Sequence, residues 1–152
     1  MTPTPSQTGD ADPEPFTRER LMQIHQDYRE ANPDATEGAA VLDFYLTPAS
    51  RARILRAFVG WPNEELSASD IYGSGDDEGL ADVSPATFTR QIDALTALEA
   101  VEETRRMNGS PLYQVNQRHP VVQALGMADN LAQHGETPLL VDDDFIGQVG
   151  EK

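Results

Sequence analysis

The stretch Ser84–Asn116 places a helical pattern directly before a β-hairpin pattern, and this succession constrains the fold more than any other part of the chain. Ser84 suits an N-cap, and Pro85 suits the first helical position, where a missing N–H has no energetic cost. Apolar residues then recur at helical spacing on one face, at Phe88, Ile92, Leu95 and Leu98. A helix over 84–98 with one buried face is therefore predicted.

The periodicity changes after Ala100, where β-forming residues replace the helical pattern. The segments Val101–Arg106 and Leu112–Val115 are predicted to be strands. Between them, Asn108-Gly109 is a strong signal for a two-residue hairpin turn. The chain is therefore expected to belong to the α+β class and to be mainly helical, with the helix and the hairpin as neighbours.

Further elements are predicted on both sides of this stretch. Apolar spacing and end signals indicate helices over 17–30 and 48–60, and a last one that begins at His119-Pro120 and ends at Gly135. In the 48–60 helix, Thr47 is the expected cap. Its arginines Arg51, Arg53 and Arg56 line the other sides of the helix, where pairing with the abundant acids is favoured over contact with phosphates.

Two short segments separate the 48–60 helix from the 84–98 helix. Leu66–Ile71 is expected to be a short strand that passes into a small helix, with Ser67 as its cap. Gly73–Gly79, with the sequence GSGDDEG, is expected to be a solvated acidic loop. Its glycine spacing differs from that of a phosphate-binding loop, and its three acids would repel phosphate.

The composition is strongly acidic. Twenty-six acids face eleven bases, the net charge is −15, and Lys152 is the only lysine. An acidic, lysine-poor chain with regular apolar patterning suggests adaptation to molar intracellular salt, as in haloarchaea, because self-repulsion of this size is tolerable when it is screened. Residues 51–119 carry seven of the eleven bases and a net charge of −4, which weakly favours this region as a nucleic-acid-binding surface.

Several classes of protein are excluded or disfavoured by what the sequence lacks. The absence of cysteine excludes disulfides, thiolate metal sites and cysteine nucleophiles. No apolar run reaches the ~20 residues that span a bilayer, and residues 1–15 have no signal-peptide core, so a cytoplasmic location is expected. The three histidines (His25, His119 and His134) are scattered, so no catalytic, metal or cofactor site is expected, and the aspartates 142–144 are taken as a solvated tail.

These patterns divide the chain into five parts. The expected parts are a disordered acidic, proline-rich arm (1–15), an N-terminal helical extension (16–46), a central domain (47–116), a C-terminal helix (117–135) and an acidic tail (136–152). The apolar stripes of the two terminal helices predict a homodimer, and the residues expected at its interface are Leu21, Ile24, Tyr28, Val121, Leu125, Ala128 and Leu131.

The order of elements in the central domain resembles that of a known family. The segments SRARILRAF, SASDI and SPATFTRQIDALTALEAVEETRRMNGSPLYQVN follow one another over 46–116. This succession is similar to the winged helix-turn-helix domains of archaeal transcriptional regulators, and to the haloarchaeal members above all. The resemblance implies a winged helix-turn-helix with N- and C-terminal helical extensions, in which one helix enters the major groove and the wing rests on the backbone or the minor groove.

The resemblance also implies which residues meet DNA. The groove-facing positions are Ser84, Ala86, Thr87, Thr89, Arg90 and Asp93, and the wing positions are Arg105, Arg106, Asn108 and Gly109. The sequence departs from the family in two respects. The connection Gly73–Asp82 between the paired helices is long and acidic, and the reading helix carries one base, Arg90, beside Asp93.

Two functions remain open from the sequence. The first is a DNA-binding transcriptional regulator in a high-salt cytoplasm, and the alternative is a winged-helix protein–protein interaction module without DNA binding. At about 1 M salt the Debye length is roughly 3 Å, so a duplex would barely sense the distant acids. Under these conditions binding must depend on short-range contacts rather than on a basic patch, because salt also removes most of the benefit of counterion release.

Overall fold

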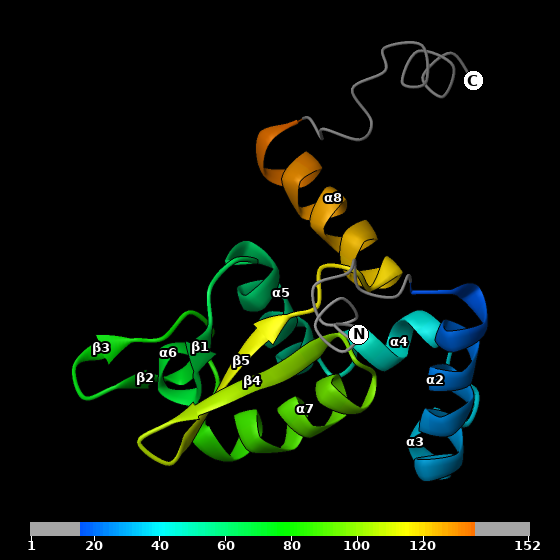
Figure 1. Cartoon of the computed structure of the whole chain (residues 1–152), viewed down its shortest axis with the longest axis horizontal. Coiled ribbons are helices and arrows are strands. Elements are labelled where there is room, and N and C mark those ends of the chain that lie inside the picture. The colour runs from blue at the N-terminus through cyan, green and yellow to red at the C-terminus, as the bar shows by residue number, and fades with distance from the viewer. Residues whose placement is uncertain (1–15, 136–152) are drawn as a thin grey trace, which may run out of the picture.

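The structure, a computed structural model, describes residues 16–135. It is α+β and 57% helical, with a small antiparallel sheet, which confirms the predicted class. Its elements are α2 (Arg18–Ala31), α3 (Pro33–Thr36), α4 (Val41–Leu46), α5 (Ala49–Gly60), β1 (Leu66–Ser67), α6 (Ala68–Tyr72), β2 (Gly73–Ser74), β3 (Asp77–Glu78), α7 (Pro85–Ala97), β4 (Val101–Met107), β5 (Ser110–Val115) and α8 (Pro120–His134) (Figure 1). Within these residues no helix combines the length and the apolar character needed to cross a membrane.

The helix α7 begins as the sequence predicts. The Ser84 hydroxyl accepts a hydrogen bond from the Thr87 backbone N–H at 3.1 Å, and Pro85 occupies the first turn. Ser84 therefore satisfies one of the four N–H groups that a helix leaves without an internal partner. At the other end, Glu99 adopts a positive φ of 61°, and the chain turns directly into β4.

The hairpin β4–β5 also forms at the predicted place. Asn108 and Gly109 have φ values of 55° and 84°, which confirms a turn with two left-handed residues. The sheet order is β1-β5-β4, all antiparallel, and Leu66 of β1 pairs with Tyr113 of β5. The strand β1 thus attaches the hairpin to the body of the molecule, and the small helix α6 follows it with Ser67 as its cap, as predicted.

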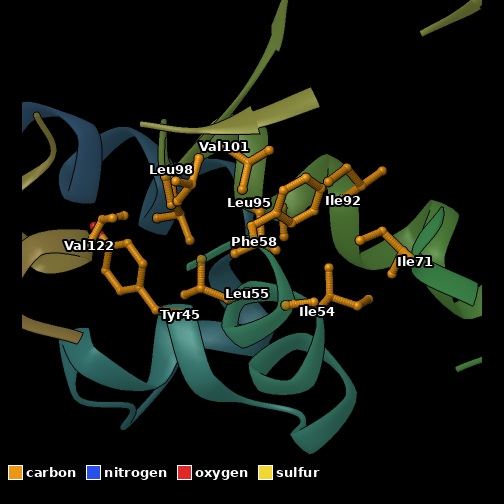
Figure 2. Packing of buried hydrophobic residues seen from close by; sticks show 14 of the residues in the cluster. Tyr45, Ile54, Leu55, Phe58, Ile71, Ile92, Leu95, Leu98, Val101 and Val122 are labelled. Carbon is orange, nitrogen blue, oxygen red and sulfur yellow. The ribbon is translucent and has the colours of Figure 1, made fainter. Parts of the chain in front are cut away.

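One hydrophobic core joins the helices and the sheet. Figure 2 shows Leu55 and Phe58 of α5 facing Leu95 of α7, and all three side chains are almost completely inaccessible to solvent. The same cluster includes residues on both sides of the 47–116 region, namely Ile24, Tyr28, Phe44, Tyr45 and Val122. The elements that flank that region therefore share its core.

This shared core corrects part of the expected subunit interface. Ile24 and Tyr28 of α2 are 6% and 7% exposed because they pack inside their own chain. They cannot form the surface that meets a second copy, as the sequence suggested. Leu21, Val121 and Leu125 are half-buried, and Ala128 and Leu131 are exposed.

Two local predictions are also wrong. Residues 74–78 are exposed, as expected for a solvated acidic segment, but the Gly73–Gly79 segment is a short hairpin in which β2 and β3 pair with each other rather than a loop. A Cβ atom on Gly79 would lie 2.1 Å from the backbone oxygen of Ile71, so only glycine permits this close approach. Thr47 does not cap α5, because its backbone N–H bonds to Asp43 and ends α4, which leaves Pro48 at the cap position.

Two histidines and a tyrosine connect four helices in the interior. His119, which precedes α8, accepts the Val121 N–H at Nδ1 (3.1 Å), so its proton lies on Nε2 and is donated to the Leu98 carbonyl (3.0 Å). The Tyr45 oxygen lies 3.3 Å from the same Nε2 and 2.6 Å from Nε2 of His25. The hydrogen bond that Nδ1 accepts from Val121 holds His119 in its neutral state, and the Tyr45 hydroxyl links this ring to His25.

Burial is the main cause of the shifted pKa values in this network. It lowers the pKa of His119 to about 4, a shift that the Leu98 carbonyl opposes and the neighbouring His25 reinforces. Burial, followed by the nearby Arg29, also lowers the pKa of His25, and burial raises that of Tyr45 far above its usual value. Protonation of His119 would place a hydrogen on Nδ1, the atom that accepts the Val121 N–H. Two donors would then face each other, so the native structure opposes protonation.

The linkage between this pKa and folding gives a testable pH dependence. Unfolded His119 takes up a proton near pH 6.5 whereas the folded ring resists protonation until about pH 4, so stability is full above pH 6.5 and declines through this window. We expect the difference in free energy of unfolding between the wild type and His119→Gln to fall by ~3 kcal/mol from neutral pH to pH 4. Chemical denaturation in molar KCl measures it. Groups outside the His119–Tyr45–His25 network titrate alike in both proteins, so a difference that stays constant with pH would contradict the shifted pKa.

Candidate nucleic-acid interface

The outward face of α7 is defined by what its inward face buries. Phe88, Ile92 and Leu95 point into the core, and Gln91 and Ala94 are buried with them, so the opposite side of the helix is turned to solvent. The exposed positions include Ser84, Ala86, Thr89, Arg90 and Asp93, with Thr87 half-buried at the edge. The structure therefore places all six groove-facing candidates along one accessible side of a rigid helix.

Hydroxyl groups at the start of α7 bond to one another. Ser84 donates to the Thr87 hydroxyl oxygen at 3.0 Å, and an Nη2 donor of Arg90 reaches the same oxygen at 3.5 Å. Thr89 donates to the Pro85 carbonyl at 3.1 Å. The structure thus brings Ser84, Thr87 and Arg90 together, and their exposed position leaves the Arg90 guanidinium accessible to a ligand.

The register of the hairpin separates its two arginines. A β-bulge lies between Glu103 and Arg105, after which Arg105 pairs with Leu112 and Arg106 pairs with Pro111. Successive residues of a strand point to opposite faces, and directly paired residues share a face. The next inward position on β5 is Tyr113, whose ring contacts Phe58 and Phe88 with centroids 6.5 Å and 6.0 Å apart.

It follows that Arg106 lies on the face of the hairpin that carries Tyr113 and packs toward α7, whereas Arg105 lies on the opposite face. The other two wing candidates, Asn108 and Gly109, form the exposed tip. Arg105 and Arg106 therefore do not act as one patch, although the sequence makes them adjacent. Arg106 is the wing arginine on the face toward α7, and Arg90 is the arginine of α7 itself.

Both arginines of the hairpin have acidic partners. Arg105 forms an ion pair with Glu65 (2.9 Å), and Arg106 pairs with Glu103 (3.4 Å) while donating to the Gly109 carbonyl (3.0 Å). Hydrogen bonds from Thr104 and Arg105 lower the pKa of Glu65. The arginine side chains are 58% and 60% exposed, and exposed pairs of this kind contribute ~0–1 kcal/mol, so a phosphate could replace either acid at little cost.

The surface formed by α7 and the hairpin is less acidic than the chain as a whole. Residues 84–116 hold four acids and three arginines, a net charge of −1, against −15 for all 152 residues. Burial raises the pKa of Tyr113, and the neighbouring carboxylates of Glu103 and Asp93 raise it further. The β2–β3 hairpin, with Asp76, Asp77 and Glu78, carries the adjoining concentration of negative charge.

Arg51 is the residue whose role the sequence analysis missed. Its Nε donates to the Gln91 side-chain oxygen (2.8 Å), and its Nη1 donates to the Tyr28 hydroxyl (2.9 Å) and the Phe44 carbonyl (2.6 Å). The expectation that it pairs with an acid is wrong, because all three partners are neutral. One guanidinium therefore connects α5 to α2, α4 and the buried side of α7.

A signal for this role was present in the sequence. Arg51 lies three, four and seven positions before the buried residues Ile54, Leu55 and Phe58, which places it on the same face of the helix. Gln91 likewise falls among the apolar positions of α7 and is 7% exposed. A pair of polar residues on the inner faces of two packed helices indicates a hydrogen bond between them, since buried polar groups require partners.

Within residues 16–135, no three histidine, aspartate or glutamate side chains converge in a way that could hold a metal ion. The aspartates 142–144 lie outside the described residues. No protein-family model, curated protein or solved structure matches this chain.

The three hydrogen bonds of Arg51 predict a large effect on stability. In Arg51→Met the Tyr28 hydroxyl, the Phe44 carbonyl and the Gln91 amide lose a donor, and we expect a loss of about 2–4 kcal/mol in the free energy of unfolding. Arg53→Met is the matched control, because Arg53 is exposed on the same helix and its replacement should change stability by less than about 0.5 kcal/mol. Equal effects in urea denaturation would show that Arg51 does not connect the helices.

Proposed function

We propose that the chain is a winged helix-turn-helix transcriptional regulator that binds duplex DNA through α7 and the β4–β5 wing in a salt-rich cytoplasm, as in haloarchaea. The observation that carries this proposal is the arrangement of α7 and the wing. The exposed Ser84 and Arg90, with the half-buried Thr87, lie on the outer side of α7, and Arg106 projects from the face of the wing that packs toward the same helix.

The element order supports this reading. The succession α5, β1, α6, α7, β4, β5, with the sheet order β1-β5-β4, is the order that a winged helix-turn-helix requires. In helix-turn-helix proteins the second helix of the pair enters the major groove, and that position belongs here to α7. The β2–β3 hairpin between α6 and α7 replaces the usual short turn and lengthens the connection without separating the two helices, which remain packed together.

The charge distribution is consistent with binding at high salt. If Arg90 and Arg106 each neutralise one phosphate, the logarithm of the binding constant falls by roughly 1.8 per decade of salt. This dependence is shallow compared with that of a protein that makes six to ten phosphate contacts. A protein that makes few phosphate contacts loses little affinity for DNA in molar KCl. Its remaining affinity comes from hydroxyl and apolar contacts to base edges.

The two wing arginines provide a matched test of DNA binding. The target duplex is first identified by genome-wide enrichment at native salt, and its affinity is then measured by fluorescence anisotropy in molar KCl. We expect Arg90→Ala and Arg106→Ala each to weaken binding by about tenfold, because each removes a charged hydrogen bond to DNA. Arg105→Ala should have a much smaller effect, since this neighbour has the same charge but lies on the opposite face.

The alternative function is a winged-helix module that binds another protein. The ion pairs of Arg105 and Arg106 favour it, because in this state neither wing arginine is left without an acidic partner. The same experiment separates the two functions. Absence of any enriched promoter region, or an affinity that is identical in wild type and Arg106→Ala, would sink the DNA-binding proposal and leave the interaction module.

A second copy of the chain is the proposed partner of α8. This helix extends away from the body of the molecule (Figure 1), and its exposed side carries Leu131 together with Ala124, Met127 and Ala128 at positions i, i+3, i+4 and i+7. Asp129 is the only acid in the helix, in a chain with 26 acids, so two copies of α8 repel each other little. The two alanines are small enough to let a second helix approach closely. Homodimers of this kind present two reading helices to paired half-sites.

A charge placed on this stripe tests the dimer. Leu131 is 44% exposed, so Leu131→Glu should fold normally, yet it would bury a carboxylate in the proposed interface. We expect the variant to sediment as a monomer at a concentration where the wild type is a dimer. Asn130→Glu adds the same charge beside the stripe and should remain dimeric. A monomeric wild type, or a dimeric Leu131→Glu protein, would overturn this interface.

A further inference from the structure

A cavity of about 230 Å³ lies beside Arg51, on the side of the molecule away from the hairpin. It is enclosed by the end of α2, by α3, by α4 and by the start of α5. Its lining combines apolar surface from Ala39, Phe44 and Pro48 with the hydroxyl groups of Tyr28 and Thr36. This combination of an apolar wall with a few converging polar groups is characteristic of small-molecule sites.

The Arg51 guanidinium borders this cavity with donors to spare. Its Nε and Nη1 atoms make the three hydrogen bonds to Gln91, Tyr28 and Phe44, whereas Nη2 has no partner among residues 16–135. In the same part of the chain every buried side-chain nitrogen and oxygen atom has a hydrogen-bond partner. Nη2 is therefore not fully buried, and Arg51 is one of the residues that line the cavity.

The positive charge of Arg51 is not neutralised by the protein. Each of the ion pairs in residues 16–135 joins another arginine to a glutamate, in Arg20–Glu99, Arg105–Glu65 and Arg106–Glu103. A half-buried guanidinium with neutral partners alone creates a positive potential that favours an anion, because a charge taken from water requires a counter-charge or full hydrogen bonding. Although the chain has 26 acids, no acid of residues 16–135 forms an ion pair with Arg51, which leaves its guanidinium open to an anionic ligand.

We propose that this cavity binds a small monocarboxylate with a compact apolar body, whose carboxylate accepts hydrogen bonds from Arg51. Asp43 also lines the cavity and is the one acid among its lining residues. Its Oδ2 accepts the Ala40 N–H at 3.2 Å, so it is turned to the backbone, and its charge still disfavours a dianion such as phosphate. The volume suits a ring or a short branched chain, since a water molecule occupies about 30 Å³.

The same guanidinium connects the cavity to the proposed DNA-reading helix. Nε of Arg51 holds Gln91, the residue next to Arg90 on α7, so a ligand that draws Arg51 toward the cavity alters the support of that helix. Binding of the carboxylate does not depend on the proposed function, whereas any effect on DNA affinity does. The experiment therefore measures the ligand alone, and its failure is distinguishable from a failure to bind DNA.

The test uses benzoate and benzamide as matched probes, with inorganic phosphate as the dianion. Titration of the full chain is followed by ¹H–¹⁵N NMR at constant molar KCl. We expect saturable shifts with benzoate at Thr36, Ala39, the Gln91 side-chain amide and the Arg51 Nε–H. Benzamide, which has the same shape without the charge, should bind at least about tenfold more weakly, and phosphate should cause no saturable shift.

Two variants locate the site. Ala39→Leu should abolish the shifts by filling the cavity, while leaving the hydrogen bonds of Arg51 in place. Arg51→Lys keeps the charge but loses the planar fork, and it should weaken benzoate by about tenfold. Ala52→Leu is the control, because Ala52 lies on the same helix and lines a different groove. Equal binding of benzoate and benzamide, or unchanged shifts in Ala39→Leu, would overturn the proposal.

Discussion

The packing of α5 against α7 is the contact on which the rest of the structure depends. Ile54, Leu55 and Phe58 on one helix meet Ile92 and Leu95 on the other, and each is at most 4% exposed. Burial of a side chain of this size stabilises a fold by roughly 1.5–3 kcal/mol, so these five supply a large share of a marginal total. Because the apolar face of α7 is committed to this contact, its other face must point to solvent. The ring of Tyr113 between Phe58 and Phe88 then sets the orientation of the wing relative to the helix.

The features that could be predicted from the sequence are those whose chemistry is local. Ser84 caps α7, Ser67 caps α6 and Asn108-Gly109 closes the hairpin, in each case because a side chain or a backbone preference acts within four residues. The missed features depend on contacts between distant residues. No local signal places a bulge between Glu103 and Arg105, and that bulge decides which wing arginine faces α7. The hydrogen bond from Arg51 to Gln91 spans forty positions, and the sequence marks both residues as lying on inner helix faces without showing that these two faces meet.

In the high salt that we propose as the setting of this protein, short contacts can matter in a chain with a net charge of −15. A Debye length of roughly 3 Å at 1 M salt removes repulsion between distant carboxylates, whereas a hydrogen bond or an ion pair at 3 Å persists. Several arginines make short contacts of this kind. Arg20, Arg105 and Arg106 each touch a glutamate, and Arg51 is held by three neutral acceptors. These four cations thus act through the groups they touch.

The helices before and after the 47–116 region are built into the core, and this changes what they can do. His119 fixes the start of α8 to the end of α7 through the Leu98 carbonyl, and Tyr45 joins the same histidine to α2. Arg51 makes a second connection, from α2 and α4 to the middle of α7. The first connection depends on a buried titratable ring and the second on a half-buried guanidinium, and a proton or an anion can disturb groups of this kind. A change at either place would reach α7 through one or two hydrogen bonds, so the terminal helices are positioned to influence the face that α7 presents to a partner.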